Sequence, residues 1–474
     1  MVILFVSAGV AALTVLGGLH WYAWRRLVRD TTSGPGAVRR LGTALFVAGP
    51  LLMVGAIVSE RAGAPFPLQQ TLSWPGFLWM PLGLYLVLAL LAGEFVRPVL
   101  RRALERRAAR HAESGGAASP AATGPVASTE PAGSVASTAP DGSTGPAEPA
   151  ESGGSTEPPE STGPAEPAPS AGPAAPADAL GPAEPADSVG PAEPAGAVRS
   201  PSRRLFVSRV VGGTAAAVAV GTVGYGTYGV LRGPGVKRVT VPLAKLPRSA
   251  HGFRIAVVSD IHLGPVLGRG FAQRVVDTIN STQPDLIAVV GDLVDGSVKN
   301  LGPAAAPLAG LRARHGSYFV TGNHEYFSGA EQWIREVREL GIHPLENART
   351  ELAGFDLAGV NDLQGESEGQ GPDFGKALGD RDTTRACVLL AHQPVQIHDA
   401  VRHGVDLQLS GHTHGGQLWP GNLIAAAANP TVAGLERYGD TQLYVSRGAG
   451  AWGPPTRVGA PSDITVVELA SREA

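Results

Sequence analysis

Five short motifs in the C-terminal part of the chain combine the side chain types that hold a pair of metal ions. The motifs are Asp260-Ile261-His262, Gly291-Asp292-Leu293-Val294-Asp295, Gly322-Asn323-His324-Glu325, Ala391-His392-Gln393-Pro394 and Gly411-His412-Thr413-His414. Together they offer carboxylate oxygens, an amide oxygen and imidazole nitrogens. Two cations about 3.5–4 Å apart are held by mixed oxygen and nitrogen ligands of this kind. The pattern therefore indicates a centre with two metal ions.

The motifs follow apolar runs that are typical of β-strands, which would place their polar side chains at strand ends. Asp260 and His262 come directly after the run Ile255–Ser259. Because side chains at i and i+2 of an extended segment point the same way, this pair suits a single metal ion. Asp292 follows Gly291, whose missing side chain lets the backbone approach closely. A carboxylate has two oxygens, so Asp292 is the expected bridging ligand between two cations.

The motif Gly322-Asn323-His324-Glu325 is expected to supply both a metal ligand and a catalytic histidine, and Asp295 is expected to support that histidine. Asn323 follows the run Ser317–Thr321, and its side-chain oxygen can bind a hard cation without adding charge. His324 would lie beside the metals rather than on one, where a histidine stabilises developing charge or protonates a leaving alkoxide. Asp295 is expected to hold His324 by a hydrogen bond, with a surface turn as the alternative. Glu325 is expected to orient the loop.

Three further histidines complete the set. His392 follows the run Val388–Ala391, and His412 and His414 lie in a glycine-bounded turn after Leu407–Ser410. Their spacing puts the last two on one side of the chain, while the turn lets them serve neighbouring metals. The other histidines flank apolar spans or lack carboxylate partners at a strand end, and they are not expected to bind metal: His20, His111, His251, His315, His343, His398 and His403.

In this order the five motifs resemble the calcineurin-like metallophosphoesterase superfamily, and the resemblance covers roughly residues 251–469. Three segments are most similar to its membrane-associated, often twin-arginine-exported bacterial branch: Gly411-His412-Thr413-His414-Gly415-Gly416-Gln417, Ser446-Arg447-Gly448 and Gly459-Ala460-Pro461. The resemblance implies an α/β fold. This fold is a four-layer αββα sandwich of two mixed β-sheets, preceded here by transmembrane helices and a disordered linker.

The resemblance also implies a role for each residue. One metal would be bound by Asp260, His262, Asp292 and His414, and the other by Asp292, Asn323, His392 and His412. His324 would be the catalytic histidine, assisted by Asp295. The cofactors would be two divalent metal ions, and Mn²⁺, Fe²⁺ and Zn²⁺ are all compatible with these ligands. The purple acid phosphatases carry a metal-binding Tyr where this chain has Asp295, which argues against their redox iron pair.

Short apolar strands alternate with helical patterns between residues 236 and 469, and this length is ample for one core. The expected strands are Ile255–Ser259, Leu286–Val290, Ser317–Thr321, Phe355–Gly359, Val388–Ala391, Leu407–Ser410, Leu443–Ser446 and Ile464–Leu469. The expected helices include Phe271–Ser281 and Ala330–Leu340. The segment 361–384 is poor in apolar residues and is predicted to be a long polar loop that rims the site.

Three apolar runs near the N-terminus are each close to the roughly 20 residues that cross a bilayer. They are Val2–Trp24, Leu41–Val58 and Trp74–Val96. Arginines cluster between the first and second runs and after the third, while the loop between the second and third carries only Arg61. The positive-inside rule therefore places the N-terminus outside and the chain after Arg97 in the cytoplasm.

Composition changes completely after the third run. Segment 112–198 is rich in Pro, Ala, Gly, Ser, Thr and Glu, and it repeats Gly-Pro-Ala-Glu-Pro-Ala. Such a segment cannot bury enough apolar surface to offset its ordering entropy, so we predict a disordered acidic spacer. The expected organisation is a three-span region (1–111), this linker (112–198), a fourth apolar segment (199–233) and a catalytic domain (236–474).

The fourth apolar run, Leu205–Leu231, begins within Ser202-Arg203-Arg204-Leu205-Phe206-Val207, which resembles a twin-arginine export signal. The alternative is an ordinary membrane span with a cytoplasmic arginine flank. Both interpretations send the following domain outside. The expected location is therefore the cell membrane, with several spans and an extracytoplasmic catalytic domain, and the twin-arginine export machinery is an expected partner only in the first case.

A net charge of -3 and a single cysteine, Cys387, limit the classes of function. One cysteine excludes an intramolecular disulfide and a Cys-based zinc cluster. The catalytic half lacks the basic run or aromatic–basic stripe that tracks a phosphate backbone, so nucleic acid is not an expected partner. The expected function is membrane-anchored, metal-dependent hydrolysis of phosphate mono- or diesters, with lipid-linked or envelope phosphates as candidate substrates. The alternative is a catalytically weak, phosphoesterase-like membrane sensor or scaffold.

Overall fold

The computed structural model of the chain describes residues 2–115 and 202–473. The predicted spacer 112–198 lies outside these residues, apart from residues 112–115, which end a helix. Within the described residues, those up to Arg110 and those from Ser202 onward form one compact unit. The N-terminal helices and the C-terminal domain are therefore described together.

Four long helices precede the C-terminal domain, where the sequence predicts apolar spans. They are α1 (Val2–Trp24), α2 (Ala37–Arg61), α3 (Phe66–Gly115) and α4 (Arg203–Leu231). Among the described residues, α2, α3 and α4 are long and apolar enough to cross a membrane. The crossing of α1 stays a prediction. A short turn joins α4 to the first strand of the domain, so this helix is its direct attachment.

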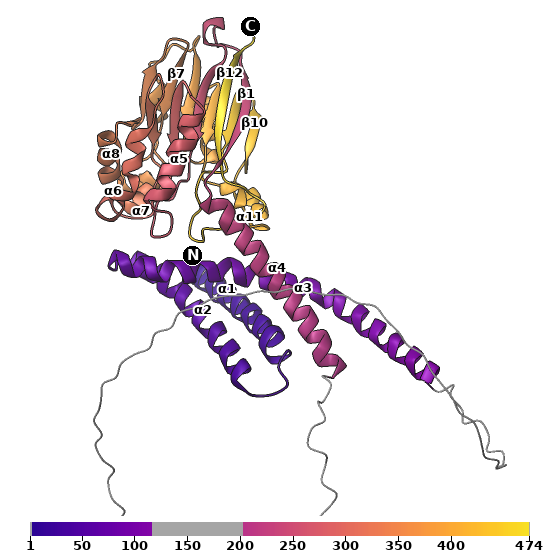
Figure 1. Cartoon of the computed structure of the whole chain (residues 1–474). Coiled ribbons are helices and arrows are strands. Elements are labelled where there is room, and N and C mark those ends of the chain that lie inside the picture. The colour runs from indigo at the N-terminus through magenta and orange to yellow at the C-terminus, as the bar shows by residue number, and fades with distance from the viewer. Residues whose placement is uncertain (1, 116–201, 474) are drawn as a thin grey trace, which may run out of the picture. The chain divides into compact units, whose positions relative to one another are not determined.

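Two six-stranded sheets form the centre of the C-terminal domain (Figure 1), in the orders β1-β12-β2-β3-β4-β5 and β10-β11-β9-β8-β7-β6. Both are mixed, because β12 runs antiparallel to β2 in the first and β6 and β10 run antiparallel to their neighbours in the second. The strands of the first sheet are β1 (Gly235–Leu243), β2 (Phe253–Val258), β3 (Leu286–Val290), β4 (Ser317–Val320), β5 (His343–Pro344) and β12 (Asp463–Ser471). Those of the second are β6 (Ala348–Glu351), β7 (Phe355–Gly359), β8 (Ala386–Leu390), β9 (Leu407–Ser410), β10 (Gly434–Tyr438) and β11 (Thr441–Val445).

Helices cover the outer faces of the two sheets, and Figure 1 shows α5, α6 and α8 along one flank. The helices of the domain are α5 (Arg269–Ser281), α6 (Val298–Ala305), α7 (Asn323–Ser328), α8 (Ala330–Glu339), α9 (Phe374–Leu378), α10 (Ile397–Arg402) and α11 (Gly421–Ala428). In α5, Phe271, Val275 and Ile279 recur every fourth residue and are buried on one face. This spacing is that of an amphipathic helix packed on a core.

Alternation along the strands builds the layers of the sandwich. Ile255 and Val257 on β2 pack against Phe355 and Leu357 of the other sheet. Their neighbours on β2 point the other way, into a core shared with α5 and α8. A third core lies between the second sheet and helices α9 and α10. The period of two along each strand thus produces helix, sheet, sheet and helix layers. This arrangement confirms the predicted four-layer sandwich of two mixed β-sheets.

Most predicted elements are present with shifted ends, and β3, β7 and β9 have the predicted bounds. The prediction of a plain polar loop over residues 361–384 is wrong in one part. A 3-10 helix, η4 (Leu363–Glu368), and α9 lie within it. Phe374 and Leu378 on α9 are buried against the second sheet. Two apolar side chains one helical turn apart are enough to dock this short helix.

The last turns of α4 pack on the loop before β12. The side-chain oxygens of Thr227 and Thr456 lie 2.7 Å apart and share a hydrogen bond. A Cβ at Gly226 would lie 2.6 Å from the carbonyl oxygen of Arg457, so only glycine permits this approach. Val230 is buried in the same core as α5. The helix is therefore part of the packing of the domain.

Trp333 on α8 is fully buried, and its Nε1 donates to the carbonyl oxygen of Gly296 at 2.8 Å, next to Asp295. We predict that Trp333→Phe lowers the free energy of unfolding by about 1–3 kcal/mol, because it leaves a gap and a buried carbonyl without its donor. Urea unfolding of the full chain in detergent, followed by circular dichroism, measures this loss. The matched control Trp452→Phe changes a side chain that is 56% exposed and should cost less than about 0.5 kcal/mol. Equal losses in the two variants would contradict the prediction.

Candidate metal centre

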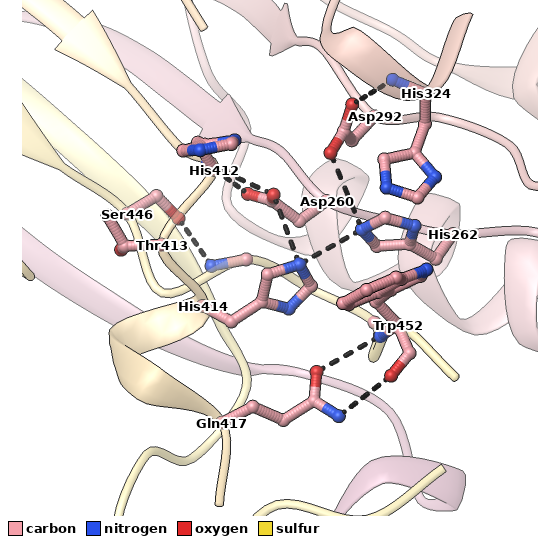
Figure 2. A network of polar contacts seen from close by, with 12 residues as sticks. Asp260, His262, Asp292, His324, His412, Thr413, His414, Gln417, Ser446 and Trp452 are labelled. Atoms are coloured by element: carbon pink, nitrogen blue, oxygen red, sulfur yellow. Dashed lines mark hydrogen bonds and ion pairs between the residues drawn. The ribbon is translucent and has the colours of Figure 1, made fainter. Parts of the chain in front are cut away.

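The predicted ligands lie in loops that follow strands of both sheets. In the first sheet β2, β3 and β4 run parallel, so the loops after their carboxyl ends meet at one edge. In the second sheet β8 and β9 are parallel neighbours in the same way. The first sheet supplies Asp260, His262, Asp292, Asp295, Asn323 and His324, and the second supplies His392, His412 and His414. Figure 2 shows side chains from both sets pointing toward one another.

Asp260, His262 and His414 form a first group of donor atoms. The Nε2 atoms of His262 and His414 lie 3.0 Å apart, and Nε2 of His414 lies 3.4 Å from Oδ1 of Asp260. Ligand atoms about 2.0–2.2 Å from one ion lie at such distances from each other. Burial, and to a smaller extent the neighbouring His262, lowers the pKa of His414 well below its usual value. The group fits one cation.

Asp292, His392 and His412 form a second group, with Asn323 beside it. Oδ1 of Asn323 lies 3.0 Å from Nδ1 of His412. Nδ1 of His392 donates to the carbonyl oxygen of Val290 at 2.8 Å, which leaves Nε2 to face the group. That Nε2 lies 3.2 Å from Oδ2 of Asp292 but in poor hydrogen-bond geometry, and it is buried without a hydrogen-bond partner among the described residues. A buried nitrogen of this kind fits a metal ligand.

One carboxylate oxygen lies between the two groups. Oδ2 of Asp292 lies 3.2 Å from Nε2 of His392 in the second group and 3.7 Å from Nε2 of His262 in the first. Its other oxygen, Oδ1, accepts from the backbone N–H of His324 at 2.9 Å. Asp292 therefore lies where a ligand shared by two cations is expected, and its binding of two cations stays a prediction.

The backbone of the ligand loops is unusual. Five predicted ligands have positive φ: Asp260 (51°), His262 (48°), Asp292 (54°), His412 (73°) and His414 (52°). Side chains other than glycine rarely adopt this left-handed region, and holding one there costs roughly 1–3 kcal/mol. The sharp reversal after each strand turns these side chains back toward the shared centre.

Two glycines leave room for the carboxylates. A Cβ at Gly322 would collide with Oδ1 of Asp292, and a Cβ at Gly411 would collide with Oδ2 of Asp260. Each carboxylate thus lies directly against the backbone of a neighbouring ligand loop. Gly322 and Gly411 are therefore needed for the two carboxylates to pack this closely against the neighbouring loops.

Glu325 holds two of the loops together. Its Oε2 accepts from the backbone N–H groups of Gly322 at 2.6 Å and Asp292 at 3.0 Å, and its Oε1 accepts from Leu293 at 2.8 Å. Burial and the nearby charge of Asp292 raise the pKa of Glu325 to about 7. These contacts agree with the loop-orienting role predicted for this residue.

Asp295 contacts two histidines rather than one. Its Oδ1 accepts from Nδ1 of His324 at 2.6 Å, as predicted, and from Nδ1 of His262 at 2.9 Å. Burial alone would lower the pKa of His324, but the hydrogen bond and charge of Asp295 outweigh it and raise the pKa to about 9. His262, Asp295 and His324 thus form a third cluster, in which both Nδ1 atoms are hydrogen-bonded to Asp295. This cluster supports the rings and leaves Nε2 of His262 for the first group.

Arg457 is a buried contact of the centre that the motifs do not include. Its guanidinium donates to Nδ1 of His414 at 3.1 Å and to the carbonyl oxygen of the same residue at 3.0 Å. These bonds fix the ring orientation of a predicted ligand. The available signal is weak: Arg457 is the single charged residue between Arg447 and Asp463.

Two exposed aromatic side chains flank His324 and were also not predicted. The ring of Trp452 lies 5.6 Å from that of His324, and the ring of Phe327 lies 5.5 Å from it, both edge-on. Trp452 is 56% exposed and Phe327 is 66% exposed. No periodic pattern in the sequence marks Trp452 or Phe327. Only the structure shows that these two aromatic rings contact His324.

Residues 253–416 match the family model for the Calcineurin-like phosphoesterase. The chain is 40% identical over 259 residues to the zebrafish (Danio rerio) "Transmembrane protein with metallophosphoesterase domain", covering 52% of this chain and 59% of that protein. It is 35% identical to an uncharacterized metallophosphoesterase of Aquifex aeolicus, covering 49% of this chain and 91% of the relative. It is 30% identical to the uncharacterized metallophosphoesterase YkuE of Bacillus subtilis, covering 58% of this chain and 99% of the relative.

The chain thus spans less than two thirds of the zebrafish protein but nearly the whole of two bacterial metallophosphoesterases. The matched segment contains all five motifs and ends beyond His414. The chain therefore belongs to the calcineurin-like phosphoesterase family.

Proposed function

We propose that the chain is a membrane-anchored phosphoesterase that uses two divalent metal ions and water to hydrolyse phosphate mono- or diesters. The observation that carries this proposal is the position of Oδ2 of Asp292 between two groups of buried donors. A carboxylate in that position can be shared by two ions. A single-ion site would not need donors on both sides of it.

The residues of the chain divide into ligands and supporting groups. Asp260, His262, Asp292 and His414 would hold one ion, and Asp292, Asn323, His392 and His412 the other. Mn²⁺, Fe²⁺ and Zn²⁺ all suit these oxygen and nitrogen donors. When bound, such a pair supplies activation of water and neutralisation of charge on the phosphoryl oxygens.

His324 is proposed as the catalytic histidine. Its Nδ1 is hydrogen-bonded to Asp295, so Nε2 is the nitrogen that remains for a substrate. The ring lies 4.7 Å from that of His262, edge-on, and therefore next to the first group of ligands. From there it can stabilise charge on a phosphoryl oxygen or protonate the leaving alkoxide. Asp295 is the positioning residue that fixes the ring.

We propose that the domain lies outside the cytoplasm, at a cell membrane that the chain crosses several times. Phe66 at the start of α3 and Leu231 at the end of α4 pack against one core of the domain. At the opposite end of α4, Arg209 donates to the carbonyl oxygen of Thr31 in the arginine-rich connection after α1. The arginine-rich ends thus lie away from the domain, which supports a cytoplasmic location for them.

Export through the twin-arginine machinery is the proposed route for this domain. Arg203 and Arg204 open α4, and the side chain of Ser202 accepts from the backbone N–H of Leu205 at its start. The route suits a domain that folds and takes up metal before it crosses the membrane. Lipid-linked or envelope phosphates, which occur at that surface, are the proposed substrates.

We predict that Asp292→Asn removes metal and activity together. The amide offers one neutral oxygen, and its nitrogen has no lone pair for a cation, so it cannot bridge two ions. Elemental analysis of the full chain in detergent should show at least about tenfold weaker retention of metal. Hydrolysis of bis-para-nitrophenyl phosphate and para-nitrophenyl phosphate with Mn²⁺ should fall to background. A folded wild-type chain with neither bound metal nor activity would favour the sensor or scaffold instead.

We predict that His324→Ala lowers turnover about 10²–10⁴-fold while both metals stay bound, because the ring is placed beside the ligands rather than among them. Turnover of para-nitrophenyl substrates and elemental analysis on the same sample measure the two effects. The matched control is His398→Ala, which changes an exposed histidine on α10 and should leave both unchanged. Loss of metal in the His324 variant, or normal turnover, would refute the assigned role.

A further inference from the structure

Helix α11 is an apolar helix that the domain leaves uncovered. None of its residues is buried, and Leu423 and Ile424 are 66% and 77% exposed. No Asp, Glu, Lys or Arg occurs from Gly415 to Leu435. A helix this short is marginal in water unless an apolar face is packed against something. The exposed apolar surface of α11 therefore needs apolar contacts that the core of the domain does not provide.

The residues just before α11 lie against the membrane helices. The hydroxyl of Tyr85 on α3 donates to the carbonyl oxygen of Trp419 at 2.9 Å. Leu418 and Val458 pack on a cluster that contains Tyr85 and Val223 on α4. At ~1.5 Å of rise per residue, Val223 lies about 12 Å before the end of α4 at Leu231. The loop before α11 thus extends down the side of α4.

The depth of this contact can be read along α4. From Arg209, at the arginine-rich end, Val223 is about 21 Å away, within the hydrocarbon thickness of about 30 Å. Tyr225 and Tyr228 follow it and are 80% and 63% exposed. Tyrosine is enriched where a span leaves the hydrocarbon for the interface. In the orientation proposed above, the segment with Leu418 and Trp419 therefore contacts α3 and α4 at the depth of the outer leaflet.

The same loop is joined to the metal centre. A Cβ at Gly416, two residues after His414, would collide with the backbone of Asn422 on α11. The side chain of Gln417 donates to the carbonyl oxygen of Trp452 and accepts from its backbone N–H, both at 3.0 Å (Figure 2). Trp452 in turn flanks His324. Direct contacts thus connect α11 to His324 through Gly416, Gln417 and Trp452.

We propose that α11 and Trp419 insert into the outer leaflet of the bilayer, and that the substrate is an amphiphilic phosphoester. Its apolar chain stays in the bilayer beside α11, and its phosphate reaches the metal centre past Trp452. The membrane contact rests on the apolar surface, its depth along α4 and the orientation proposed above. The substrate class rests on the proposed function and narrows the lipid-linked or envelope phosphates named there to esters whose apolar chain lies in the bilayer beside α11.

The membrane contact is tested by spin labelling of the full chain in phosphatidylglycerol vesicles. Ile424→Cys carries the nitroxide, and the matched control is Asp440→Cys, whose side chain is fully exposed in the β10–β11 turn. The one native cysteine, Cys387, is buried, and burial raises its pKa to about 12, so it escapes labelling. We expect oxygen to relax the label at position 424 more than a water-soluble nickel complex does, and the reverse at 440. Stronger relaxation of the label at position 424 by the nickel complex than by oxygen would overturn the insertion, whether or not the chain hydrolyses the test esters.

The substrate class is tested with esters that share a reacting group and differ in chain length. The probes are hexadecyl phosphate against methyl phosphate, together with the para-nitrophenyl diester of each. We expect the hexadecyl compounds in vesicles to be hydrolysed at least about tenfold faster than the methyl compounds. Equal rates would overturn the amphiphilic substrate. Cleavage of neither series, with metal bound, would count against the proposed function, and the label at 424 would still decide the membrane contact.

Charged substitutions separate the helix from the metal centre. Leu423→Asp combined with Ile424→Asp should reduce hydrolysis of the hexadecyl compounds at least about tenfold, because inserting two carboxylates into hydrocarbon is costly. The methyl compounds should be hydrolysed within about twofold of the wild-type rate, because the double variant is otherwise intact. The matched control is Val401→Asp, which changes a 39% exposed valine on α10 and should change neither rate. Equal losses on both chain lengths would overturn the role of α11 in substrate access.

Discussion

The centre is organised by the need to hold two buried carboxylates and several imidazole rings within a few ångströms of one another. Asp260 and Asp292 are both buried, and burial, with repulsion from Asp292 as a smaller cause, raises the pKa of Asp260. Bringing such groups together is unfavourable unless positive charge lies between them. The surrounding structure supplies rigidity against that repulsion, through left-handed ligand residues, glycine contacts and the backbone hydrogen bonds of Glu325.

Neither sheet contains a complete centre. The first contributes the carboxylates, the amide and His262, and the second contributes three imidazoles, so the predicted ligands meet only because the sheets pack face to face. The core between Ile255 and Phe355 is therefore what sets the distance between the two ligand sets. Arg457 adds a third element, since it fixes His414 from the loop before β12. Packing far from the candidate centre thus decides the arrangement of the predicted ligands.

The sequence identified residues that the structure brings together, because each follows a buried strand, where alternation and apolar runs are strong signals. The limits of β3, β7 and β9 followed from the same signal. Edge strands such as β1 and β10 were missed because one face is exposed and carries Arg238 or Glu436. Arg457 and α9 were missed for a different reason: their roles come from contacts with distant segments, which no local pattern encodes.

The contact of α4 with the loop before β12 connects a predicted membrane span directly to the candidate metal centre. Gly226 rests against the backbone of Arg457, and Arg457 holds the ring of His414. A span tilts to match the hydrocarbon thickness of the membrane around it. Because packed atoms rather than a flexible tether lie between the span and the ring, a change in the tilt of α4 would reach His414 through direct contacts.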